Sequence, residues 1–164
     1  MAGSTSCTAE PESPKSLLWV DSEETSGDDS PGRYAIDGDA STFWGTGWSA
    51  GDVPLPHEIA VDLGSRRSVC GIHLLPRQGT NPGAVNGQIA KYAVYATDDP
   101  DVALSHDVTA WGRPVATGTL PSGFQPKFAA FPKPVTARYL MVQALSEQNG
   151  KPWTTIAELT VDAA

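Results

Sequence analysis

Two aspartates, Asp37 and Asp39, flank a glycine in the first third of the chain, and Thr42 follows three residues later. A tight turn of this composition can aim side-chain and main-chain oxygens at one point, which is what a hard cation such as calcium requires. Glu158 is the one acid in a short apolar run near the end of the sequence, where an unpaired charge is costly to bury. Two interpretations stay open: a cation site completed by a distant carboxylate, or Asx turns in which the aspartates only cap their own loop.

Residues 47–51 read Gly-Trp-Ser-Ala-Gly, which is the pattern of the nucleophile elbow in α/β-hydrolases. The elbow requires a strand that turns sharply into a helix. Asp52, Pro54 and Pro56 follow too closely for a helix to form at this position. We therefore interpret the match as accidental, assign no catalytic role to Ser49, and expect a protein that is not an enzyme.

Other residue types offer weaker chemistry. The chain has three histidines, His57, His73 and His106. None of them is spaced with a cysteine or a glutamate as zinc ligands are, so the sequence does not indicate a zinc site. His57 lies between a proline and a predicted strand and is expected to be a structural loop residue. Four acids are close enough in sequence for paired-carboxylate chemistry: Glu23, Glu24, Asp28 and Asp29. Acids at the end of a strand usually form a solvated rim, and we adopt that interpretation.

The elements that must position these residues are short β-type runs separated by clusters of Gly, Pro, Asn and Asp. The predicted strands cover residues 17–24, 58–63, 69–75, 91–97, 114–120, 127–131, 137–145 and 155–161. Within residues 99–110 we expect at most a single helical turn. Short strands without crossover helices predict an all-β fold, an antiparallel sandwich of jelly-roll or Greek-key type. The longest loops, 25–33, 45–57 and 79–88, are where we expect a site.

The 164-residue chain has an apolar fraction of 40% and five tryptophans, enough for one domain with a buried core. Residues 1–16 are small, polar and broken by proline, so we expect a flexible leader or linker before a single domain at 17–164. The net charge of −8 argues against nucleic acid and anionic membranes as partners. No segment approaches the roughly 18 apolar residues of a spanning helix. Cys7 and Cys70 either form a disulfide or leave Cys70 as a buried thiol.

A series of motifs, in order along the chain, carries a family resemblance. They are Ala35-Ile36-Asp37-Gly38 with Thr42-Phe43-Trp44, Pro56-His57, Leu75-Pro76-Arg77-Gln78, Asn86-Gly87, Val94-Tyr95, Trp111-Gly112, Ala137-Arg138-Tyr139, and the stretch from Asn149 to Leu159. Together they resemble the discoidin domain family, also known as coagulation factor five/eight type C domains and as family 32 of carbohydrate-binding modules. The resemblance implies an eight-stranded antiparallel β-sandwich of jelly-roll type, in agreement with the predicted strands.

The resemblance also implies a structural cation, calcium or sodium. Its ligands would be the carbonyl of Tyr34, the side chain of Asp37, the carbonyl of Asp39, the carbonyl and hydroxyl of Thr42, the carbonyl of Ala157 and the carboxylate of Glu158. A shell filled by protein oxygens leaves no open position for a substrate. We therefore expect the ion to fasten the Asp37 loop to the last strand and to take no part in catalysis.

The resemblance further implies a sugar site on the loops at one end of the sandwich. Arg77 matches the family's sugar-binding arginine, and Asn81 or Asn86 matches the asparagine that follows it. Gly45 stands where galactose-binding members have a histidine. The loss of that side chain removes a directed hydrogen bond, which weakens the expectation that galactose is the ligand.

Trp48 and Trp153 are the candidates for a flat aromatic platform under the sugar ring, whereas Trp44 is expected in the core. The alternatives are that these tryptophans only cover the end of the sandwich and that Arg77 forms a buried ion pair with a loop aspartate. We expect a non-catalytic carbohydrate-binding module, covalently linked to a catalytic domain in a secreted enzyme, that binds a neutral or amino sugar. The alternative is an assembly domain that packs on a catalytic partner and binds no sugar.

Overall fold

Two long strands, β3 (His57–Leu75) and β6 (Lys127–Ala144), organise the computed structural model, which describes residues 10–164. The other strands are β1 (Ser16–Val20), β2 (Trp44–Gly45), β4 (Lys91–Thr97), β5 (Ala116–Thr119), β7 (Thr155–Ile156) and β8 (Glu158–Ala163). The helical segments are α1 (Pro100–Leu104) and the short 3-10 turns η1 (Gly32–Ile36), η2 (Pro82–Val85) and η3 (Val108–Trp111). The all-β prediction is confirmed, and α1 is a short helix inside the segment where a single turn is expected.

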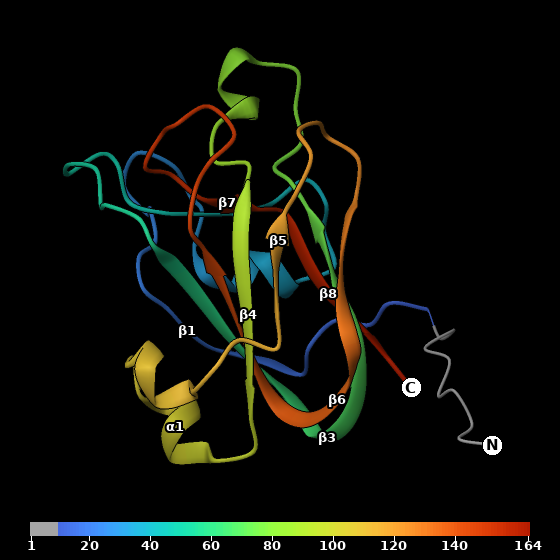
Figure 1. Ribbon diagram of the computed structural model, residues 1–164. Coiled ribbons are helices and arrows are strands. Elements are labelled where there is room, and N and C mark those ends of the chain that lie inside the picture. Colours follow the sequence, from blue (N-terminus) through green and yellow to red (C-terminus); the bar gives the residue numbers. More distant parts are fainter. Residues whose placement is uncertain (1–9) are drawn as a thin grey trace.

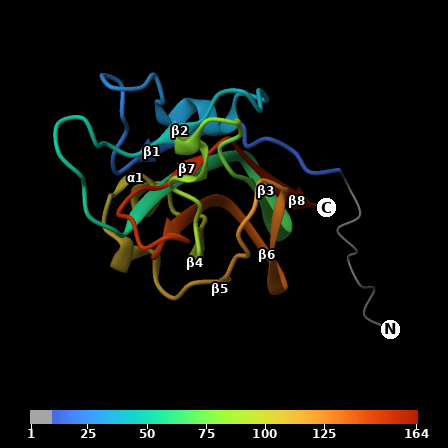
Figure 2. The same ribbon diagram turned by 90° about the horizontal axis from the view of Figure 1, so that it is seen from above.

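Six strands form one antiparallel sheet in the order β1-β3-β6-β4-β5, with β8 added along β3. The first part of β3 pairs with β1 and its last part pairs with β8, while β6 follows β3 along both parts. Figure 1 shows β3 and β6 curving together at one end of the molecule, so that they pass from one layer of the sandwich to the other. β2 and β7 form a separate pair. In Figure 2, which looks from above, this pair lies on the opposite side from β4 and β5.

The strand boundaries expected from the sequence are wrong for β3 and β6, each of which is one strand and not two. β3 includes the runs at 58–63 and 69–75, and β6 includes those at 127–131 and 137–145. The register between them shifts at irregularities, and in β6 the pairing passes from Val135 directly to Ala130. Pro132 and Pro134 fall in that gap, where their missing N–H groups break no ladder hydrogen bond. Residues that usually end a strand therefore bend it here.

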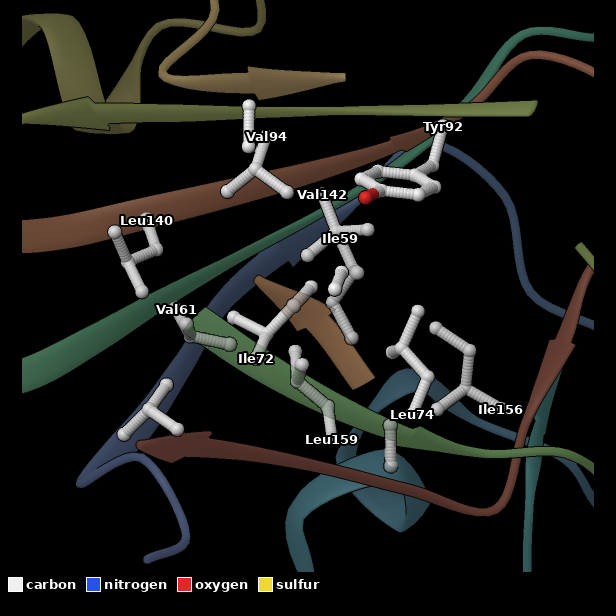
Figure 3. Packing of buried hydrophobic residues seen from close by; sticks show 14 of the residues in the cluster. Ile59, Val61, Ile72, Leu74, Tyr92, Val94, Leu140, Val142, Ile156 and Leu159 are labelled. Atoms are coloured by element: carbon white, nitrogen blue, oxygen red, sulfur yellow. The ribbon is translucent and has the colours of Figure 1, made fainter. Parts of the chain in front are cut away.

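Side chains of β3 and β6 fill the space between the layers. Alternate residues of a strand face the same side, so Ile59 and Val61 of β3 and Leu140 and Val142 of β6 all point inward. None of these four is more than 2% exposed. Figure 3 shows them facing Ile72, which belongs to the second half of β3. The apolar alternation seen in the sequence therefore marks the core.

A second, smaller cluster lies around Trp19 and Met141, where α1 packs against the sheet. The indole nitrogen of Trp19 donates to the carbonyl oxygen of Ala103 in α1 at 2.8 Å, and the ring of His106 stacks on the indole with 4.1 Å between centroids. Figure 1 places α1 near the curved end of β3 and β6. This cluster is therefore a second packing site at the end away from the pocket described below.

The chain enters the fold along β8. The Glu12 N–H donates to the Val161 carbonyl at 2.9 Å, and the Val161 N–H donates to the Glu12 carbonyl at 2.8 Å. Cys7 lies outside the described residues, and Cys70 in β3 is not a free thiol. Within residues 10–164, none of the helices has the length and apolar character needed to cross a membrane.

Candidate functional site

A pocket of about 260 Å³ opens where the loops 45–57, 76–90 and 145–154 gather, opposite the bend of β3 and β6 (Figure 1). We call this the loop end. The aromatic, charged and amide side chains that line the pocket are Asp28, Phe43, Trp48, Arg77, Asn86 and Trp153. Tertiary folding thus brings an arginine, an asparagine and two tryptophans from separate parts of the chain to one pocket.

Arg77 lies directly after β3, and two contacts fix its guanidinium group. Its Cζ atom is 4.4 Å from the centre of the Phe43 ring, and its Nη1 donates to the carbonyl oxygen of Gly83 at 3.2 Å. No carboxylate in the described part of the chain forms an ion pair with Arg77. The alternative of a buried ion pair is therefore wrong, and the other N–H groups of this planar fork remain available to a ligand.

Asn81 and Asn86 cap the two ends of η2, and only Asn86 is among the pocket-lining residues. Both side chains surround Gly83. A Cβ atom placed on Gly83 would lie 3.3 Å from Oδ1 of Asn81 and 3.9 Å from Nδ2 of Asn86. Of the two asparagines left open by the sequence, the geometry favours Asn86 as the pocket residue.

Trp48 forms an exposed aromatic surface of the pocket, with 43% of its surface accessible. Its indole nitrogen donates to Oδ2 of Asp28 at 3.3 Å. A Cβ atom on Gly27 would lie 2.6 Å from Cη2 of the indole, so the ring packs directly on this glycine's backbone. The ring is thus held at its edge and at one place beneath it, while much of it remains open for a ligand.

Trp153 is half-buried, and its indole nitrogen donates to Oδ1 of Asp52 at 2.8 Å. The preceding Pro152 carbonyl lies 2.6 Å from Nε2 of His57, whose Nδ1 lies 2.8 Å from Oδ2 of Asp21. Burial opposes a charged ring, but these two acceptors prevail and raise the pKa of His57. His57 is fully buried and fastens β3 to the loop that carries Trp153, which agrees with a structural role. The expectation of a loop residue is wrong, because His57 is the first residue of β3 and pairs with Ala144.

The prediction of a solvated acidic rim is wrong for Glu24, which is only 4% exposed. Its carboxylate accepts hydrogen bonds from the backbone N–H groups of Ser26, Gly27, Trp48 and Ser49 and from the Ser49 hydroxyl. These bonds, with that of the Ser49 backbone foremost, hold the pKa of Glu24 far below its usual value. The Gly-Trp-Ser-Ala-Gly segment forms a loop without a following helix. Its serine, Ser49, donates hydrogen bonds to the Glu24 carboxylate. No local sequence pattern indicates a contact between residues so far apart.

Among the predicted cation ligands, contacts join Asp37, Asp39, Thr42 and Glu158, close to where η1 meets β8. Tyr34 belongs to η1, and Ala157 directly precedes β8. The Thr42 hydroxyl is 2.6 Å from Oδ2 of Asp37 and 3.0 Å from the Asp39 carbonyl oxygen. The Asp39 N–H donates to Oδ1 of Asp37 at 3.0 Å, so the local Asx turn also forms. Glu158 has a buried Oε1 without a hydrogen-bond partner. Burial, together with the hydrogen bond and negative charge of Asp37, raises the pKa of Glu158 to about 7.

This arrangement fits a hard cation. A buried carboxylate oxygen without a partner, facing a second carboxyl group, is the kind of donor that calcium or sodium binds. In the described part of the chain no group of three or more His, Cys, Asp or Glu side chains is arranged to hold a metal ion, so carbonyl oxygens and the Thr42 hydroxyl would supply the rest of the shell. The residues that would hold the ion are Tyr34, Asp37, Asp39, Thr42, Ala157 and Glu158. The ion would supply charge neutralisation between the η1 loop and β8.

Comparison with known families accounts for most of the chain. Residues 19–159 match the F5/8 type C domain. The chain belongs to this family. The F5/8 type C domain described here is 39% identical over 148 residues to a sialidase of Micromonospora viridifaciens, and 41% identical over 128 residues to a galactose oxidase of Gibberella zeae. These alignments cover 90% and 77% of this chain but only 21% and 17% of the two enzymes.

Solved structures agree with this assignment. A family 32 carbohydrate-binding module from Clostridium perfringens NanJ, in complex with galactose, superposes with a TM-score of 0.67 at 32% identity, over 87% of this chain and 90% of that one. Another from the same organism, in complex with GalNAc-β-1,3-galactose, gives a TM-score of 0.71 at 25% identity, over 89% and 99%. The C-terminal domain of a Bacteroides fragilis chitobiase shares the fold, with a TM-score of 0.76 at 24% identity over 94% and 98% of the chains. The predicted discoidin-type β-sandwich is thereby confirmed.

Gly45 is the position at which the resemblance drawn from the sequence implies a histidine in galactose-binding members. The residue belongs to β2 and lines the pocket. A Cβ atom at this position would lie 3.1 Å from Oγ of Ser30 and 3.3 Å from Cε2 of Phe43. A side chain at this position would therefore require Ser30 and Phe43 to shift by a few tenths of an ångström.

Proposed function

We propose that this F5/8 type C domain is a non-catalytic carbohydrate-binding module that holds a neutral or amino sugar at the loop end. The observation that carries the proposal is the convergence of Arg77, Asn86, Trp48 and Trp153 on one pocket. Planar donors beside exposed aromatic faces suit a pyranose, whose rim carries hydroxyl groups and whose faces carry apolar C–H groups. The relatives that share this fold include modules in complex with galactose and with GalNAc-β-1,3-galactose, which supports a sugar as the ligand.

Each side chain has a distinct part in the proposed recognition. Arg77, held by Phe43 and Gly83, donates to sugar hydroxyl groups, and Asn86 both donates and accepts. Trp48 stacks on one C–H face. A site with a few hydrogen bonds and one stacking face binds in the millimolar to micromolar range, on the order of −4 to −8 kcal/mol.

Charge narrows the class of sugar. Asp28 places a carboxylate at the pocket, and the whole chain carries a net charge of −8. A carboxylate accepts a hydrogen bond from a hydroxyl group or pairs with an ammonium group, and it repels a uronic or sialic acid. The proposed ligand is therefore a neutral or amino sugar. Nucleic acid and anionic membranes are disfavoured by the same charge.

The cation is proposed as a structural element of this module. Calcium or sodium bound by the shell described above would neutralise the facing carboxyl groups of Asp37 and Glu158 and join η1 to β8. The buried, unpartnered Oε1 of Glu158 supports this assignment.

The setting of the module is proposed from its relatives. The two enzymes named above are several times longer than this chain, which corresponds to about a fifth of each. We infer that the module is part of a secreted carbohydrate-active enzyme and keeps a catalytic neighbour close to its glycan. Attachment to that neighbour would offset the weak affinity of a single site through a high effective concentration.

Isothermal titration with galactose, N-acetylgalactosamine, fucose and a glucosamine oligomer tests the proposal. We expect heat from at least one sugar, and loss of that heat in R77A with an unchanged melting temperature. R66A is the matched control, because Arg66 pairs with Asp98 and does not line the pocket. Absence of heat from every sugar, with the fold intact, would overturn the proposal in favour of an assembly domain that binds a protein partner only.

A further inference from the structure

Glu24 is buried behind the pocket and does not line it, yet it is bonded to several residues that do. Its Oε1 accepts the N–H groups of Trp48 at 2.8 Å and Ser49 at 2.7 Å. Its Oε2 accepts the N–H groups of Ser26 and Gly27, each at 2.9 Å, and the Ser49 hydroxyl at 2.7 Å. One carboxylate therefore ties together two loops that are more than 20 residues apart in sequence.

The backbone of Glu24 extends this network to the floor of the pocket. Its N–H donates to the carbonyl of Gly45 at 2.8 Å, and its carbonyl accepts the N–H and the hydroxyl of Ser30 at 2.9 Å and 3.0 Å. Both Ser30 and Gly45 line the pocket. The main chain and the side chain of this one buried residue thus form hydrogen bonds with three residues that line the pocket: Ser30, Gly45 and Trp48.

The loop that Glu24 holds is the one on which the Trp48 indole rests. Gly27, whose N–H binds Oε2, lies directly under the indole, and Asp28, the next residue, accepts the indole N–H. The backbone of Trp48 and the surface that supports its ring are therefore both fixed to the same carboxylate.

We propose that Glu24 is a positioning residue for sugar binding, which holds the Trp48 ring in its stacking orientation before the ligand arrives. The inference rests on the proposed function. A platform ordered in advance spares the ligand the entropy of ordering a loop and an aromatic side chain, a saving that appears directly in the affinity. The strongly depressed pKa of Glu24 agrees with a carboxylate that stays ionised and saturated by donors.

Glu24→Gln is the direct test, because the amide keeps the size of the side chain but turns an NH2 group toward backbone donors. We expect the Kd for the bound sugar to rise about tenfold. Glu23→Gln is the matched control: Glu23 is the adjacent acid and accepts one backbone N–H, that of Gly32 at 2.8 Å, away from the Trp48 loop. It should change the Kd by less than twofold.

A double-mutant cycle with Trp48→Ala separates positioning from a general loss of stability. If Glu24 acts through Trp48, E24Q adds less than twofold to the Kd in the W48A background. An equal effect in both backgrounds, or a lowered melting temperature with an unchanged Kd, would overturn the proposal. If E24Q does not fold, Ser49→Ala is the substitute, because it removes one of the five hydrogen bonds to the Glu24 carboxylate at an exposed residue. We expect S49A to raise the Kd two- to threefold, and to leave the Kd unchanged in the W48A background.

A second measurement is independent of any sugar. The five tryptophans give five indole N–H resonances, and Trp48→Phe identifies that of Trp48. In E24Q we expect a lower heteronuclear NOE for this resonance alone. An unchanged NOE in E24Q would overturn the positioning role even if sugar binding is established. A lowered NOE without any sugar binding would overturn the proposed function but keep the role of Glu24 in ordering the loop.

Discussion

The guanidinium carbon of Arg77 lies 4.4 Å from the centre of the Phe43 ring, so the aromatic residue directly before β2 contacts the arginine that follows β3. A cation over an aromatic face is stabilised by the ring quadrupole, by about 1 kcal/mol at a partly exposed site. In the proposed sugar site, Phe43 would therefore affect ligand binding through Arg77, although the two residues are far apart in sequence.

Phe43→Leu tests this support. Leucine keeps an apolar contact but lacks the quadrupole, so we expect the Kd for the bound sugar to rise about fivefold, which corresponds to about 1 kcal/mol. Titration calorimetry of the folded variant measures this change. Phe128→Leu is the control, since Phe128 is exposed on β6, where its ring lies tilted against that of His73, and it does not line the pocket. Equal Kd values for wild type and F43L would show that Phe43 does not orient Arg77 for binding.

Calcium is expected to raise the melting temperature. A ligand that binds only the folded state at 100 times its Kd adds about 2.7 kcal/mol to the free energy of unfolding, which for a domain of this size corresponds to about 6 °C. Differential scanning calorimetry with and without calcium measures the shift, and Glu158→Gln should abolish it.

Asp107→Asn is the control for the calcium experiment. Asp107 accepts the N–H and the hydroxyl of Thr109 in a turn like that of Asp37. The variant D107N should keep the calcium-dependent shift. A wild-type melting temperature that does not respond to calcium or to sodium would contradict the cation assignment.

Stability is expected to fall as the pH rises from 5 to 8. Burial, and then the negative charge of Asp21, raise the pKa of Glu58 to about 7, and Oε2 of Glu58 has no hydrogen-bond partner. A raised folded-state pKa means that the contribution of Glu58 is complete below its unfolded pKa and is lost as the pH rises through 7. The loss between pH 5 and 8 is about 2 kcal/mol. His57, whose pKa is also raised, acts in the same direction.

Thermal unfolding in saturating calcium at both pH values measures this dependence. Glu58→Gln removes the titrating group and keeps its shape, so the difference in unfolding free energy between pH 5 and pH 8 should shrink by about 2 kcal/mol. Glu23→Gln should leave the difference as it is in the wild type. A profile for E58Q that coincides with the wild type would locate the pH dependence elsewhere.

Trp44→Phe is expected to lower the free energy of unfolding by about 2 to 3 kcal/mol. Trp44 is 1% exposed, and its indole nitrogen donates to the Ser22 carbonyl at 2.8 Å, so the variant leaves both a cavity and an acceptor without its donor. Urea unfolding measures the change. Trp48→Phe, at an exposed position, should cost less than about 0.5 kcal/mol. Equal losses in the two variants would contradict the assignment of Trp44 to the core.

Local residue patterns were enough to predict the strand-forming runs, the family motifs and the residue types of the site. Alternation of apolar residues is local, so the burial of Ile59 and Val61 could be predicted from their neighbours. The same locality explains the expected turn chemistry at Asp37 and the expected burial of Trp44.

Which of these residues meet depends on the three-dimensional fold. The union of two predicted runs into β3 depends on the continuous pairing with β6, and the choice of Asn86 over Asn81 depends on how η2 turns beside the pocket. Glu24 could not be predicted as buried, because its donors at Trp48 and Ser49 reach it only when two loops close over the same sandwich end. A periodic pattern records which side of an element faces inward, whereas contacts between distant loops are set by loop closure and leave no period in the sequence.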